Sequence, residues 1–92
     1  MRNLKISKDL MINNKFGIHA RPAAMLVRTA TRFKADITVE KGNIRVSGKS
    51  ILGIMTMEAG CGTSLRVIAD GTDAKEAIEE IEKLFANSFY EE

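Results

Sequence analysis

The apolar residues of this chain change their spacing several times, and these changes limit the possible folds more than any other feature. Near residues 4–12, 36–40, 44–47 and 65–69 they fall on every second position, which is typical of strands with one buried face. Over residues 20–32 and from Asp73 onward they fall three or four positions apart, which predicts two amphipathic helices. The short apolar stretch 51–55 predicts one or two helical turns capped by Ser50.

The order of these elements predicts the fold class. Lys41-Gly42-Asn43 joins two of the strands as a hairpin, and Lys8 alone interrupts the alternation of the first strand. Asp73 and Glu76 are expected in the first turn of the last helix, where negative charge is favourable. Strands with one apolar face form an antiparallel sheet, and the helices must cover that face. We therefore expect one α+β domain over residues 1–92, an open-faced two-layer sandwich of four antiparallel strands and three helices (βαββαβα).

Composition excludes several classes of protein. Hydrophobic residues make up 45% and charged residues 28% of the chain, as in ordinary globular proteins. Cys61 is the only cysteine and His19 the only histidine, so neither a disulfide framework nor a zinc site is expected, and Cys61 is assigned no role. No apolar run approaches the roughly 20 residues of a membrane span, and no signal peptide is visible, so we expect a cytoplasmic protein.

Charge is divided unevenly along the chain. Residues 1–50 carry a formal charge of +8 and residues 51–92 carry −6, which predicts a basic and an acidic face. The basic face would attract acidic partners. Nucleic acid is not expected as a partner, because the chain has no Trp, one Tyr and four Phe, and no basic run interleaved with aromatic residues.

Residues 17–22 carry the clearest functional signal. Pro22 is tolerated in the first turn of a helix, which places His19 at or beside the N-cap. The free N–H groups of Ala20 and Arg21, the helix dipole and the Arg21 guanidinium would all favour an anion there. Gly17 permits an unusual backbone angle that could present the imidazole outward. The dipole favours neutral, nucleophilic imidazole, so His19 is predicted to accept a phosphoryl group; the plain alternative is a surface histidine in a turn.

The basic stripe of the first helix borders a second candidate surface. Met25 lies between arginines rather than on the packing face, and Met side chains adapt to varied partners. Gly48-Lys49-Ser50 is not a nucleotide-binding P-loop, because Asn43 stands where that motif requires Gly. The predicted docking residues lie on this helix and the short helix after Ser50: Ala20, Ala24, Met25, Arg28, Ile51, Leu52 and Met55.

The segments GIHARPAA and SGKSILGIMTM resemble the HPr family of histidine-containing phosphocarrier proteins of the bacterial phosphotransferase system. The resemblance covers nearly the whole chain. It implies that His19, assisted by Arg21, accepts phosphoryl from enzyme I and passes it to enzyme IIA domains of sugar transporters. It also implies a monomeric carrier without cofactor that is not an enzyme, and regulation at Ser50 by HPr kinase/phosphorylase.

Besides a phosphocarrier, two hypotheses remain from the sequence: a regulatory protein with the same fold, and a small hydrolase. Phe16 and Ser47 depart from the common pattern of the family, which leaves the nitrogen-regulatory branch open, and Ser50 leaves a purely regulatory binding role open. A small hydrolase on a similar scaffold is the third hypothesis. It would need a group to position water, and no carboxylate lies near His19 in the sequence. The sequence names neither the sugar nor the transporter.

Overall fold

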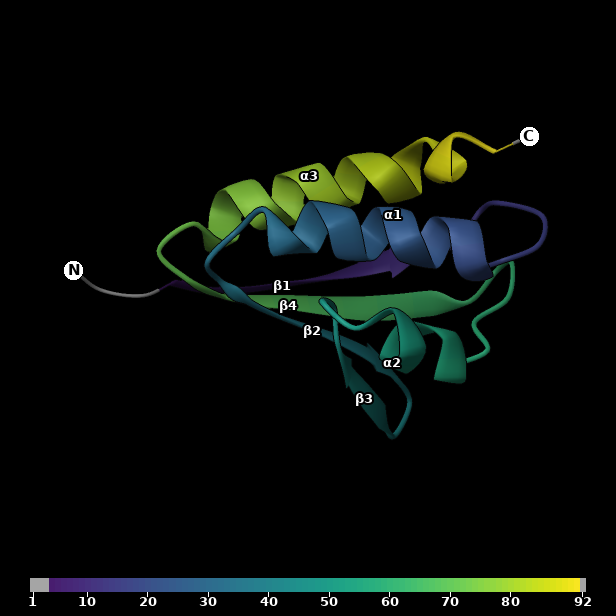
Figure 1. Cartoon of the computed structure of the whole chain (residues 1–92), viewed down its shortest axis with the longest axis horizontal. Coiled ribbons are helices and arrows are strands. Elements are labelled where there is room, and N and C mark those ends of the chain that lie inside the picture. The colour runs from purple at the N-terminus through teal and green to yellow at the C-terminus, as the bar shows by residue number, and fades with distance from the viewer. Residues whose placement is uncertain (1–3, 92) are drawn as a thin grey trace.

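The computed structural model describes residues 4–91 and contains one four-stranded sheet covered by helices (Figure 1). The strands are β1 (Leu4–Met11), β2 (Asp36–Lys41), β3 (Ile44–Ser47) and β4 (Ser64–Gly71), in the order β1-β4-β2-β3 with every neighbouring pair antiparallel. The helices are α1 (Ala20–Thr31), α2 (Ile51–Thr56) and α3 (Ala74–Ala86), followed by the short turn η1 (Ser88–Tyr90). The predicted βαββαβα open-faced sandwich is confirmed.

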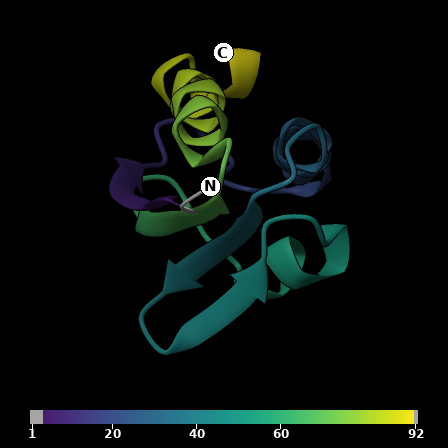
Figure 2. The same ribbon diagram turned by 90° about the vertical axis from the view of Figure 1, so that its left-hand side faces the viewer.

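The layers follow from the alternation in the strands. Val67 of β4 lies opposite Lys8 of β1 and Val39 of β2, so the central strands bring their apolar positions into one buried layer. Seen end on, α1 and α3 lie side by side over this layer, and α2 lies beside α1 next to β3 (Figure 2). The opposite face of the sheet is polar and carries ion pairs such as Arg66–Asp9, at 3.1 Å. The core therefore lies between the sheet and the helices.

Edge strand β1 explains two exceptions to the apolar pattern. Leu4 is exposed at the start of this strand, although the alternation places it on the inner face. Lys8 also lies on the inner face, at the margin of the sheet, and its ammonium group contacts Glu82 of α3 at 3.0 Å. A lysine is tolerated there because its stem can cover apolar surface while its charged end reaches solvent.

Helix α1 has the two faces that the sequence predicts. Ala23, Leu26 and Ala30 are fully buried, whereas Arg28 on the other side is exposed. Val27, which was expected to pack with them, is only half-buried. The helix begins at Ala20 and its last helical residue is Thr31, in agreement with the expected span of 20–32.

Asp73 behaves differently from the expectation. It occupies the N-cap position of α3, but its side chain makes no capping hydrogen bond to that helix. Instead its carboxylate accepts hydrogen bonds from the backbone N–H groups of Lys34 and Ala35, both at 2.8 Å. The bond from Lys34 is the main reason that the pKa of Asp73 lies below its ordinary value. Asp73 therefore joins the α1–β2 loop to the start of α3.

Neither a membrane-spanning helix nor a metal-ligand cluster occurs in the described part of the chain. None of the helices within residues 4–91 combines the length and apolar character needed to cross a bilayer. The same residues contain no group of three or more His, Cys, Asp or Glu side chains arranged to hold a metal ion.

Candidate functional site

His19 is the N-cap residue of α1 and has extended backbone angles, φ −84° and ψ −168°. Its side chain forms no capping bond, and 42% of it is exposed. The first N–H that bonds within the helix is that of Ala23, which donates to the His19 carbonyl at 3.0 Å. The N–H groups of Ala20 and Arg21 come before it and have no acceptor within the helix, as expected for a first turn. The predicted position of His19 is therefore confirmed.

Gly17 fixes the loop that leads into this helix. Its φ is +67°, in the left-handed region that favours glycine. A Cβ atom at this position would collide with the carbonyl oxygen of Ala59 and lie 2.7 Å from the Cα of Gly60. The next residue, Ile18, donates its N–H to that same Ala59 carbonyl at 2.9 Å. The backbone before His19 is therefore held against the α2–β4 loop by a contact that only glycine permits.

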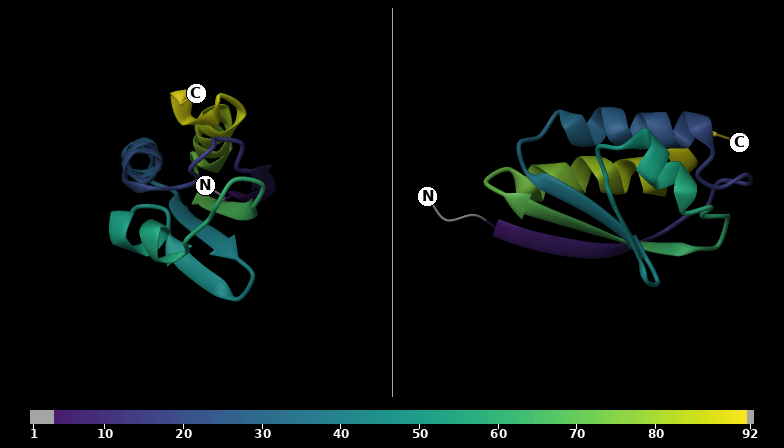
Figure 3. Two further views of the ribbon diagram at one scale, coloured as in Figure 1. Left: turned by 90° about the vertical axis from the view of Figure 1, so that its right-hand side faces the viewer. Right: turned by 60° about the horizontal axis from the view of Figure 1, so that its bottom comes forward.

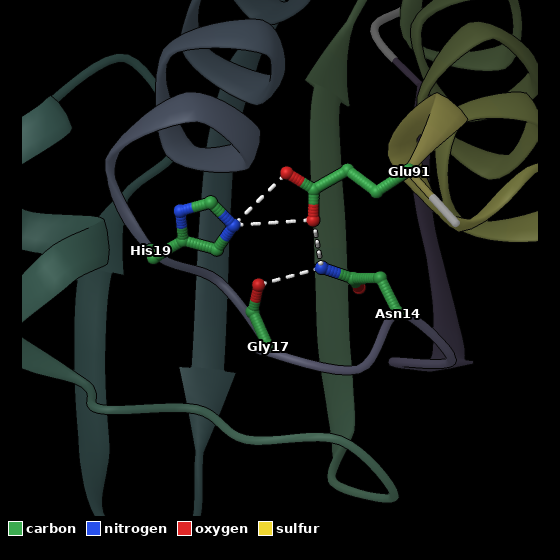
Figure 4. Close-up of polar contacts among 4 residues, drawn as sticks. All are labelled: Asn14, Gly17, His19 and Glu91. Carbon is green, nitrogen blue, oxygen red and sulfur yellow. Dashed lines mark hydrogen bonds and ion pairs between the residues drawn. The ribbon is translucent and has the colours of Figure 1, made fainter.

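A carboxylate that sequence reasoning missed lies against the imidazole (Figure 4). Nε2 of His19 is 2.9 Å from Oε2 and 3.1 Å from Oε1 of Glu91. The buried side chain of Asn14 also donates to Oε1, at 3.0 Å, and to the carbonyl of Gly17, at 2.6 Å. No carboxylate lies near His19 in the sequence, but the fold brings Glu91 to it from 72 positions away in the chain.

These contacts determine the charge state of Glu91. Burial is the largest single influence on its pKa and by itself would raise it. The hydrogen bonds from Asn14 and His19, together with the nearby positive charge of Arg21, outweigh burial and hold the pKa of Glu91 below its ordinary value. Glu91 is therefore a carboxylate at neutral pH.

The chain reaches His19 through the turn that follows α3. Ser88, Phe89 and Tyr90 have φ values of +51°, +53° and +58°, so three successive residues are left-handed. Phe89 is fully buried, and its ring centroid lies 4.9 Å from that of Phe85. In the sequence, Phe85 and Phe89 are four positions apart, and this helical spacing is the signal that could have indicated that the chain stays packed beyond α3. Burial of Phe89 thus anchors the segment that carries Glu91.

A shallow hollow of about 410 Å³ surrounds the imidazole. The ring of Phe16 stands nearly perpendicular to that of His19, at 86° and with centroids 6.4 Å apart, and is 72% exposed. Arg21 also borders the hollow, so its guanidinium is available to an anion bound beside His19. The hollow is lined by Phe16, His19, Arg21, Tyr90 and Glu91.

Ser50 caps α2 as the sequence predicts. Its Oγ accepts a hydrogen bond from the N–H of Gly53 at 3.0 Å. Ile54 of this short helix is buried, whereas Leu52 is 73% exposed. Ile51 and Met55 are exposed beside Leu52. Helix α2 lies next to α1 (Figure 3). On α1, Ala20 and Arg28 are exposed, and Ala24 and Met25 are half-buried. The residues predicted to dock partners therefore lie on two adjacent helices.

An accessible histidine at a helix N-terminus, where free N–H groups and the helix dipole favour an anion, is suited to carrying a phosphoryl group. The family profile described as "PTS HPr component phosphorylation site" matches residues 6–87. The phosphocarrier protein HPr of Treponema pallidum is 45% identical over 87 residues, covering 95% of this chain and 99% of that protein. The chain belongs to the HPr family of the phosphotransferase system.

Solved structures agree with this assignment. The crystal structure of HPr-C-His from Thermoanaerobacter tengcongensis has a TM-score of 0.86 and 42% sequence identity, covering 100% of this chain and 99% of that one. HPr from Bacillus anthracis has a TM-score of 0.84 and 40% identity, covering 88% and 96%. The protein is thus a phosphocarrier of the phosphotransferase system and not an enzyme in its own right. This assignment, rather than the absence of a carboxylate, decides against the hydrolase hypothesis.

Proposed function

We propose that His19 carries the phosphoryl group, which it receives from phosphorylated enzyme I and passes to enzyme IIA domains of sugar transporters. The observation that supports this most is the exposed imidazole at the start of α1, where the N–H groups of Ala20 and Arg21 precede the first intrahelical bond. Once phosphorylated, the ring would bear a dianion facing these donors, the helix dipole and the Arg21 guanidinium. Arg21 would thereby stabilise the phosphoryl group during transfer.

The test is phosphorylation by enzyme I and phosphoenolpyruvate. His19→Ala should accept no acid-labile, base-stable phosphoryl group, and Arg21→Ala should fold normally but transfer more slowly. Arg66→Ala is a matched control, because this arginine lies on the open face of the sheet and pairs with Asp9. Acid-labile labelling of His19→Ala at the wild-type level contradicts the assignment of His19. An Arg21→Ala rate equal to that of Arg66→Ala contradicts the role of Arg21.

We further propose that α1 and α2 form the docking surface for enzyme I and enzyme IIA. The exposed apolar side chains of Ile51, Leu52 and Met55 would form its centre, with Arg28 at its basic rim. Interfaces of this kind bury an apolar patch, whereas charges at the rim act mainly on the rate of association. Ala20, Ala24 and Met25 of α1 complete the surface.

Ser50 is proposed as a regulatory site for HPr kinase/phosphorylase, because its hydroxyl lies at the start of the exposed part of α2. A phosphoserine there adds about −1.5 to −2 charges beside the docking surface. Ser50→Ala loses the cap, at a cost of about 0.5–2 kcal/mol, and should still be phosphorylated on His19. Ser50→Asp keeps a capping oxygen and should be slow with enzyme I. An Asp variant as fast as wild type would leave Ser50 as a helix cap alone.

We also propose that the carrier acts as a monomer in the cytoplasm, without cofactor and without a nucleic-acid partner. The polar open face of the sheet, with its Arg66–Asp9 and Arg45–Glu40 ion pairs, supports a solvated surface rather than an interface between copies. Sedimentation equilibrium at rising protein concentration is the test. A mass that remains that of one 10.1 kDa chain agrees with the proposal, and a concentration-dependent doubling contradicts it.

A further inference from the structure

Glu91 approaches the imidazole of His19 from one side only. Both of its carboxylate oxygens lie within 3.1 Å of Nε2, while Nδ1 faces away from Glu91 in the close-up view (Figure 4). The carboxylate is itself held by the amide of Asn14, which is 2% exposed. A buried donor that also bonds the Gly17 carbonyl leaves little freedom for Glu91 to approach Nδ1.

The chemistry of the pair distinguishes the two ring nitrogens. An ionised carboxylate has only acceptor atoms, so its contact with neutral imidazole requires the ring hydrogen on Nε2. Nδ1 then carries the free electron pair and is the nucleophile. We propose that Glu91 is a positioning residue, which keeps the ring hydrogen of His19 on Nε2 and so directs phosphoryl transfer to Nδ1. This inference rests on the proposed role of His19.

The transfer balances without a proton relay. The electron pair of Nδ1 forms the nitrogen–phosphorus bond while the bond from phosphorus to the donor atom of phosphorylated enzyme I breaks. The electrons of the broken bond leave with that donor atom. The ring becomes a phosphorylated imidazolium whose Nε2–H still faces Glu91, and the carboxylate offsets its positive charge. When phosphoryl passes to an acceptor, the electron pair returns to Nδ1 and regenerates the original neutral tautomer. Because Nε2 keeps its hydrogen, the ring leaves as neutral imidazole when the phosphoryl group passes to the acceptor.

The fold holds Glu91 at this place through Phe89. The left-handed turn over residues 88–90 is unfavourable for non-glycine residues, so it must be compensated by packing. Full burial of Phe89 against Phe85 supplies that packing two residues before Glu91. The contact with His19 is therefore part of the tertiary structure and not the chance position of a surface side chain.

The first test reads the tautomer directly by nitrogen NMR of the imidazole. His19 is the only histidine, so its two ring nitrogens give the only such signals in the protein. We expect the Nε2–H tautomer to dominate in the unphosphorylated wild type. Glu91→Gln should yield a mixture, because a carboxamide can donate to one tautomer and accept from the other. Glu79→Gln, on the exposed side of α3, should leave the wild-type tautomer unchanged.

The second test follows phosphoryl transfer. Phosphorus–nitrogen coupling in the phosphorylated wild type should locate the phosphorus on Nδ1. Glu91→Gln and Glu91→Ala should slow phosphorylation by about tenfold, by analogy with the carboxylates that orient metal-bound histidines, whose loss costs about 10–100-fold. Glu91→Asp should recover part of the rate if it restores the Nε2–H tautomer. Glu79→Gln should transfer at the wild-type rate.

Several results would overturn the inference. They are an Nδ1–H tautomer in the wild type, phosphorus on Nε2, or a tautomer and rate unchanged in both Glu91→Gln and Glu91→Ala. Faster phosphorylation of those two variants would also overturn it, because Glu91 would then mask His19. The tautomer is measured without any phosphoryl group. Failure of His19 to accept phosphoryl at all would therefore be recognised separately, as failure of the proposed function.

Discussion

Adding one methyl group at Gly17 should destabilise the fold and misplace His19 at the same time. In Gly17→Ala the new Cβ would overlap the Ala59 carbonyl oxygen and lie 2.7 Å from the Cα of Gly60. Both of these are backbone atoms, so no flexible side chain can move aside. The residue must also keep a φ of +67° or change its backbone conformation.

The expected loss of unfolding free energy in Gly17→Ala has two parts, and the same substitution at a second glycine measures one of them alone. A left-handed conformation costs a residue with a Cβ about 1–2 kcal/mol, and forcing extra atoms into a packed contact costs about 1–3 kcal/mol more. Gly17→Ala should therefore lose roughly 2–5 kcal/mol of unfolding free energy. Gly42 has a φ of +56° in the β2–β3 hairpin, and a Cβ there would meet nothing within 4 Å. Gly42→Ala should thus lose only the first part.

Urea denaturation followed by circular dichroism measures both variants, and phosphorylation by enzyme I measures the site. Gly17→Ala should have the lower midpoint and, under conditions where it is folded, a slower transfer rate. Gly42→Ala should transfer at the wild-type rate. The reasoning is refuted if Gly17→Ala is as stable as Gly42→Ala, or if it is destabilised as expected and still transfers at the wild-type rate.

Three further predictions concern other parts of the molecule. Arg28→Glu should slow association with enzyme I in stopped-flow measurements, and the wild-type rate should fall as salt rises. Asp73→Asn should lower the urea midpoint at neutral pH. The hydrogen bond from the N–H of Lys34 is the main cause of the lowered pKa of Asp73 in the folded state. The stabilisation that ionised Asp73 provides is therefore fully present above its unfolded-state pKa and is lost as pH falls through its folded-state pKa. The stabilities of wild type and Asp73→Asn should thus converge in acid. Phe89→Ala should cost about 3–5 kcal/mol of unfolding free energy, measured in urea, and release Glu91 from His19.

Each of these has a control in the same chain. Lys75→Glu changes an exposed charge on α3, away from the docking surface, and should not alter association. Asp70→Asn removes an exposed carboxylate of β4 and should not reproduce the pH dependence of Asp73→Asn. Tyr90→Ala truncates a ring that is 62% exposed and should cost far less than Phe89→Ala. Equal effects of a variant and its control would contradict the corresponding prediction.

The parts of the fold that sequence reasoning predicted are those with local causes. The helix at Ala20 follows from Pro22 and the apolar spacing after it, and the cap at Ser50 needs only the N–H of Gly53, three residues on. The positive φ of Gly17 agrees with the unusual backbone angle that glycine permits at this position. In each case the relevant partners are close in the chain or the residue type itself carries the information.

The rest depended on contacts between distant segments. Nothing near Asp73 in sequence indicates that its carboxylate would bond the α1–β2 loop, 38 and 39 positions away, instead of its own helix. The turn over residues 88–90 has no glycine or asparagine to signal left-handed backbone. Glu91 was therefore missed, because its approach to His19 depends on that turn and on the burial of Phe89.

The position of η1 has a practical consequence for anyone handling this protein. A peptide inserted directly after Glu91 would begin at the edge of the hollow around His19. Strand β1 begins at the opposite end of the molecule, away from η1 (Figure 1). On the proposed role of His19, an affinity tag or fluorophore attached before β1 should leave the histidine free to meet enzyme I, whereas one attached after η1 should compete with enzyme I for the same space.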